Sequence, residues 1–140
     1  MAEYTTIGTV SVASGSNIPF TETAVKANTC IYHREGAGAV TLRGQTNQCF
    51  ARYKVSFGGN LAVPEDGTAE AISVAISVNG EPLESATAIY TPADTQEYGN
   101  VFTAVFVQVP KGCCTTVAVE NTSTQEIYVA NSNLIVERVA

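Results

Sequence analysis

Short stretches of alternating apolar and polar residues run along the whole chain, separated by turn-forming residues. Val, Ile, Thr and Tyr are abundant in these stretches, and Gly, Asn, Asp and Pro cluster between them. This pattern predicts an all-β sandwich, and no segment favours a helix. We expect strands at Ile7–Ala13, Ile18–Val25, Cys30–Arg34, Ala39–Leu42, Phe50–Phe57, Glu70–Val78, Ser85–Tyr90, Val101–Val109, Thr115–Glu120, Glu126–Ala130 and Leu134–Val139.

Two of these strands have no charged face. In Glu70–Val78, Ile and Val alternate with Ala and Ser, and in Val101–Val109 valines alternate with Phe102, Ala104 and Phe106. A face of a sandwich that meets water normally carries charged or strongly polar residues. We therefore infer that a second subunit covers the outward face of Val101–Val109. The alternative is that Phe102 and Phe106 pack under a long loop of the same chain.

Composition supports a hidden surface. Charged residues make up 14% of the chain, against about 25% in typical soluble domains. The net charge of −6 and the scattered Lys and Arg residues argue against a nucleic-acid partner. The sequence shows no secretion signal and no apolar run of about 18 residues. We therefore expect synthesis in a cytoplasm and no membrane partner.

A family resemblance rests on four segments. They are GAVTLRGQTNQCFARYKVSFGGNLAV, AISVAISVNGEPL, VFTAVFVQV with the Pro-Lys-Gly turn after it, and TTVAVEN followed by the final NLIVERV. Their order resembles the jelly roll of tumour necrosis factor and of the complement globular head. It is most similar to the bacterial and bacteriophage branch, which includes the hair-tip domain of exosporium filaments and small virion surface proteins. The resemblance covers roughly residues 18–140.

The resemblance implies an antiparallel ten-strand jelly roll that forms a homotrimer. Residues 18–140 would form the jelly-roll domain, and residues 1–17 either an N-terminal arm or a first strand. Tyr53, Phe102, Ala104 and Phe106 are the expected trimer contact.

By analogy, the function would be structural display on the surface of a virion or similar particle, as a capsid decoration or head-fibre protein. The N-terminal arm would then bind a capsid or fibre protein. No collagen-like Gly-x-y stalk is present, which favours this role over that of a spore-surface protein. The other alternative is a tip module that binds a receptor or a host surface glycan.

Candidate chemistry is sparse. His33 is the sole histidine, and Cys30, three residues away on an extended strand, would face the opposite side. No Gly-x-Ser-x-Gly motif is present. The cysteines lack the paired short spacing of zinc sites, and the acidic turns at residues 65–67 and 94–97 are interpreted as solvated. We therefore expect neither an enzyme nor a cofactor nor a bound metal.

The four cysteines have two open interpretations. Cys30, Cys49, Cys113 and Cys114 are either buried thiols or, near a three-fold axis, inter-chain cross-links, and the sequence leaves their redox state undetermined.

One loop and one short motif complete the candidates. Tyr90 and Tyr98 flank a loop that contains Asp94, which makes this loop a candidate ligand site; the alternative is that Tyr98 anchors the loop. Asn121-Thr122-Ser123 matches a glycan acceptor motif and is interpreted as a turn.

Overall fold

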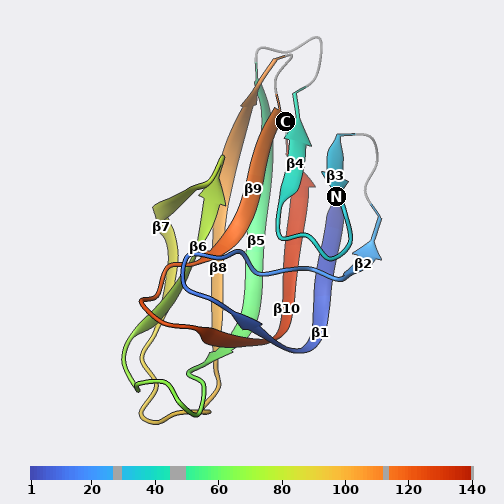
Figure 1. Cartoon of the computed structure of the whole chain (residues 1–140). Helices are drawn as coiled ribbons and strands as arrows, with labels where there is room; N and C mark the ends of the chain where they lie inside the picture. Colours follow the sequence, from blue (N-terminus) through green and yellow to red (C-terminus); the bar gives the residue numbers. More distant parts are fainter. Residues whose placement is uncertain (27–29, 45–49, 112–113, 140) are drawn as a thin grey trace.

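The computed structural model describes residues 1–26, 30–44, 50–111 and 114–139, with residue 50 described by its backbone alone. These residues form ten strands and no helix (Figure 1). The strands are β1 (Ala2–Val12), β2 (Glu22–Val25), β3 (Ile31–His33), β4 (Val40–Arg43), β5 (Phe50–Ala62), β6 (Ile72–Val78), β7 (Glu81–Tyr90), β8 (Gly99–Pro110), β9 (Cys114–Asn121) and β10 (Ile127–Arg138).

The strands form two five-stranded antiparallel sheets. Sheet A has the order β2-β1-β10-β5-β8, and sheet B has the order β3-β4-β9-β6-β7. Ala2 pairs with Val136, so the two ends of the chain lie side by side at one end of the sandwich (Figure 1). This is an antiparallel ten-strand jelly-roll sandwich, as predicted, while the trimer stays a prediction.

The core lies between the sheets and is built from alternate residues of the long strands. In β6, Ile72, Val74 and Ile76 are fully buried, as the aliphatic face of this strand predicts. The rings of Phe20 and Phe57 pack edge to face at 6.4 Å between centroids, an arrangement that aromatic pairs prefer.

A tight turn sets the pairing of β6 with β7. Asn79 and Gly80 have φ values of 52° and 85°, which a two-residue type I′ hairpin requires at both central positions. Val78 and Glu81 pair directly on either side of this turn. The Asn-Gly dipeptide thus starts β7 at Glu81, four residues before the start expected from the sequence.

The last two predicted strands are one strand. β10 continues through the polar residues between them, and its register against β5 shifts between Ala130 and Asn133. Asn131, at φ 50°, accepts a 2.9 Å hydrogen bond from the Gly8 amide of the adjacent strand. A bulge therefore bends the strand here without ending it.

The N-terminal segment belongs to the sandwich. β1 pairs with β10 on one side and with β2 on the other, so residues 1–17 contain a first strand. Its backbone is already hydrogen-bonded in the sheet, so Ala2–Val12 is not available as a free arm for a capsid or fibre protein. Ile18 and Phe20, expected in a strand, are buried in the core, although the strand begins only at Glu22.

Candidate assembly surface and groove

The outward face of sheet A carries two large exposed aromatic side chains on β8. Phe102 and Phe106 are each 66% exposed, and Ala104 lies half-buried between them. The three residues, called the aromatic strip below, point outward because the valines that alternate with them face the core. No described segment covers the two phenylalanines, so the alternative of a loop packed over them is wrong.

Small residues flank the aromatic strip on β5. In the β5–β8 register, Gly58 lies opposite Phe102 and Ser56 lies opposite Ala104. Ile135 of β10 pairs with Ser56 on the far side and is half-buried. The outward face therefore has exposed aromatic side chains on β8 beside the small residues Gly58 and Ser56, with the exposed Lys54 opposite Phe106.

A shallow groove extends this face at one end of the strip. Its volume is about 390 Å³, and its lining consists of Arg52, Phe106, Gln108 and Val139. Val139 is held here because its amide donates a 2.9 Å hydrogen bond to the Arg52 carbonyl oxygen. The aromatic strip is thus continuous with a concave apolar surface.

Tyr53, expected at the trimer contact, is a core residue. It is 0% exposed, and its hydroxyl donates a 2.7 Å hydrogen bond to the Arg43 carbonyl oxygen. Burial is the main cause that raises the pKa of the Tyr53 phenol, and the neighbouring Cys30 thiol also raises it. The prediction for Tyr53 is wrong because odd-numbered residues of this part of β5 face the core.

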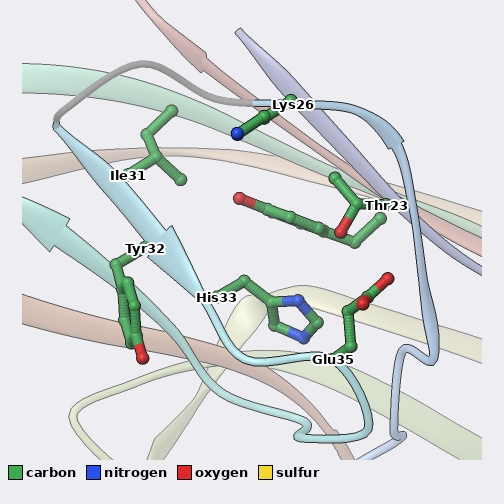
Figure 2. Close-up of a pocket in the computed structure, with 7 residues that line it drawn as sticks. Thr23, Lys26, Ile31, Tyr32, His33 and Glu35 are labelled. Atoms are coloured by element: carbon green, nitrogen blue, oxygen red, sulfur yellow. The ribbon is translucent and has the colours of Figure 1, made fainter.

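The second surface feature is a groove between the edge strands β2 and β3. It has a volume of about 570 Å³ and is lined by Tyr4, Thr23, Lys26, Ile31, Tyr32, His33 and Glu35. Figure 2 shows Thr23 and Lys26 on one side, with Ile31 and His33 on the strand opposite. Tyr32 projects from β3 away from His33, and Glu35 lies beyond His33 with its carboxylate directed toward Thr23.

His33 forms part of the floor of this groove and is not simply a surface residue. Its Nε2 lies 2.8 Å from the Ala37 carbonyl oxygen, and a carbonyl only accepts, so Nε2 carries the proton. The ring lies 4.3 Å from the Tyr4 ring between centroids and packs edge to face on Phe20. Nδ1 is buried without a hydrogen-bond partner. Such packing holds the ring in place and presents no nucleophile beside it.

The loop between β7 and β8 is anchored by Tyr90. The Tyr90 hydroxyl donates a 3.1 Å hydrogen bond to the Glu97 carbonyl oxygen, and its ring lies against Gly99. Asp94 accepts a hydrogen bond from the next amide through Oδ1, and Tyr98 is exposed. Tyr90 therefore anchors the loop, and the candidate ligand site of Tyr90, Asp94 and Tyr98 stays a prediction.

Two of the four cysteines lie in the described residues. Cys30 is partly buried and packs against the core, and Cys114 is exposed at the start of β9, where it pairs with Arg43. Cys49 and Cys113 lie outside the described residues. The two interpretations of the cysteines stay predictions.

The glycan acceptor motif at Asn121 is buried. Asn121 is 0% exposed, and its side-chain amide donates 3.0 Å hydrogen bonds to the carbonyl oxygens of Val12 and Gln125. Its Oδ1 accepts from the Ser123 amide. Asn121 therefore closes a turn, as interpreted from the sequence.

The described residues contain no group of three or more His, Cys, Asp or Glu residues that could hold a metal ion. They also contain no helix long and apolar enough to cross a membrane.

Comparison with known proteins defines the fold. No protein-family model and no curated protein matches the sequence. Among solved structures, the Eiger TNF of S. frugiperda is similar with a TM-score of 0.70 and 14% identity, over 99% of this chain and 91% of that one. The globular domain of zebrafish complement 1qA has a TM-score of 0.63 and 12% identity, over 96% and 94% of the two chains.

A third similar structure is the PRD1 vertex protein P5. Its TM-score is 0.54 at 11% identity, and the match covers 99% of this chain and 96% of that one. Identities this low establish a shared fold. The expected resemblance to the fold of tumour necrosis factor and the complement globular head is thus confirmed, and the closer similarity to the bacterial and phage branch stays a prediction.

Proposed function

We propose that the chain is a non-enzymatic structural protein that forms a homotrimer and is displayed on the surface of a virion or similar particle. The observation that carries the proposal is the aromatic strip on β8, whose two phenylalanines are each 66% exposed. The outward face of sheet A is the proposed contact surface.

The energetic argument is the burial of apolar area. Full burial of a Phe side chain stabilises by about 1.5–3 kcal/mol, and Phe102 and Phe106 supply two such side chains in every copy. Ser56 and Gly58 beside them are small, so a second surface can approach the sheet closely. A contiguous exposed apolar patch of this kind is typical of an interaction site.

The comparisons support the trimer and the absence of catalysis. Proteins of this fold usually form trimers, and they are typically non-catalytic. β8 is an edge strand, so the strip of one copy can contact the small residues Gly58 and Ser56 of the next, and such head-to-tail contacts close into rings. Placement on a virion is supported by the likeness to a phage vertex protein.

The mass of the purified protein in solution tests the assembly. We expect three times the 14.7 kDa of one chain by light scattering at micromolar concentration. Phe106→Asp should give monomers, because an unpaired charge buried in a contact costs about 3–5 kcal/mol. Circular dichroism should show an intact sandwich, since Phe106 makes no part of the core.

Ile89→Asp is the matched control. Ile89 is 69% exposed on β7, which belongs to sheet B and not to the sheet whose outward face forms the proposed contact, so this variant should stay trimeric. A wild-type mass near one chain would overturn the trimer, and loss of assembly in both variants would overturn the assigned surface. Placement on a particle is tested separately by mass spectrometry of density-purified particles from the source culture, where absence of its peptides contradicts display.

A further inference from the structure

The groove between β2 and β3 is a second surface feature that the proposed assembly does not use. β2 is the edge strand of sheet A and β3 is the edge strand of sheet B, on the side of the sandwich opposite β8. The two sheets separate here, and the space of about 570 Å³ between them is within the range of small-ligand sites. The groove therefore stays open when the aromatic strip is covered.

Four polar side chains in this groove have no partner among the residues that the structure describes. The Tyr4 hydroxyl, the Thr23 hydroxyl, the Lys26 ammonium and the Glu35 carboxylate form no hydrogen bond or ion pair with any described residue. Lys26 and Glu35 thus offer one donor group and one acceptor group to the same groove without pairing with each other. Thr23 can donate and accept, and Figure 2 shows it between them along the β2 side.

The floor of the groove is held rigidly. The His33 ring is fixed by its 2.8 Å hydrogen bond to Ala37 and by its stacking at 4.3 Å against the Tyr4 ring. Tyr4 belongs to β1 of sheet A, and His33 belongs to β3 of sheet B. A floor that does not need to be ordered on binding reduces the entropic cost of holding a ligand.

The charges of the lining select the class of ligand. The positive charge of Lys26 and the negative charge of Glu35 cancel. A groove without net charge disfavours a phosphate, a ligand whose only charged group is a carboxylate, and a simple cation. Hydroxyl groups both donate and accept, so a neutral ligand with several hydroxyls satisfies Lys26, Glu35 and Thr23 together.

We propose that the groove between β2 and β3 binds a neutral saccharide of one or two rings. Glu35 accepts hydrogen bonds from neighbouring hydroxyls, and Lys26 and Thr23 bind hydroxyls at the opposite wall. This proposal is independent of the trimer, because it uses no residue of the aromatic strip.

Titration of the full chain with defined sugars tests the proposal by NMR. The probes are lactose, maltose, cellobiose and chitobiose, each at up to about 10 mM, a concentration at which a site with a dissociation constant of about 1 mM is mostly occupied. We expect at least one sugar to shift the amide signals of Thr23, Tyr32, His33 and Glu35. Glycine at the same concentration is the comparison ligand, because a zwitterion also matches one cation and one carboxylate.

Variants assign the binding to the groove. Glu35→Gln and Thr23→Val should each weaken the sugar by about tenfold, because each removes a hydrogen bond to the ligand. Glu84→Gln, an exposed carboxylate on β7, is the matched control and should leave affinity unchanged. Shifts with glycine alone, shifts confined to another part of the surface, or no shift with any of the four sugars would each overturn the proposal. These variants should leave the mass measured by light scattering unchanged. A failure of the sugar-binding proposal can therefore be told apart from a failure of the trimer proposal.

Discussion

The phenol hydroxyl of Tyr53 on β5 donates a 2.7 Å hydrogen bond to the carbonyl oxygen of Arg43 at the end of β4. β5 belongs to sheet A and β4 to sheet B, so this bond joins the two layers of the sandwich. Tyr53 therefore stabilises each subunit internally, and its contribution does not depend on assembly.

Tyr53→Phe should lower the stability of the subunit without changing its mass in solution. The substitution keeps the ring but removes this hydrogen bond to the Arg43 carbonyl oxygen, which costs about 0.5–1.5 kcal/mol. Urea unfolding followed by circular dichroism measures the change. The contrary result would be a variant that no longer assembles but keeps its urea midpoint at fixed protein concentration. Tyr53 would then belong to the subunit contact and not to the core.

Alkaline pH should destabilise the fold through its buried phenols. Burial raises the pKa of Tyr4 and the pKa of Tyr53 above the ordinary value. The unfolded chain then loses these protons first, so the free energy of unfolding is constant below a pH of about 10 and falls above it. Unfolding curves at increasing pH check this, and the fall should be shallower in Tyr53→Phe. An unchanged slope in that variant would contradict the role of Tyr53.

Gly99→Ala should loosen the loop between β7 and β8. A Cβ at this position would lie 2.3 Å from the Tyr90 ring, and such overpacking costs about 1–3 kcal/mol. The melting temperature should fall, and hydrogen exchange should rise in residues 91–98. Tyr90→Phe removes only the 3.1 Å hydrogen bond to Glu97 and should lower the melting temperature less. If Tyr90→Phe lowered the melting temperature as much as Gly99→Ala or more, ring packing would not be what holds the loop.

Asn121→Ala should destabilise strongly. It removes the hydrogen bonds to the carbonyl oxygens of Val12 and Gln125 and leaves these groups unsatisfied, at a cost of about 3 kcal/mol. Asn100→Ala, in which a largely exposed amide is lost, should cost less than 1 kcal/mol by the same reasoning. Thermal unfolding of both variants compares the two, and equal losses would contradict the special role of Asn121.

Local patterns predicted much of the fold. Alternation identified most of the strands, the Asn-Gly dipeptide marked the turn after β6, and the two apolar faces of Val101–Val109 marked the aromatic strip. The predicted strand boundaries were wrong where pairing between strands distant in the sequence overrides the local sequence pattern. The residues around Asn131 lay outside both strands expected there, yet the hydrogen bond from Gly8 holds them as a bulge within β10.

The candidate groove had no signal in the sequence. Tyr4, Thr23 and His33 come from three different strands, and none of them stands in a motif with the others. Similarly, Tyr53 sits in a strand whose alternation was recognised, but alternation does not say which of its two faces meets the core.

The sequence by itself determined the β class, the unusually uncharged face of β8 and the lack of a recognisable catalytic motif, because these follow from residue type and period along one strand. Only the tertiary structure decided that β1 belongs to the sandwich, that Tyr53 is internal and that β2 and β3 border a groove. Those facts depend on which strands neighbour each other across long sequence separations. Chain topology sets these neighbours, and no local alternation encodes them.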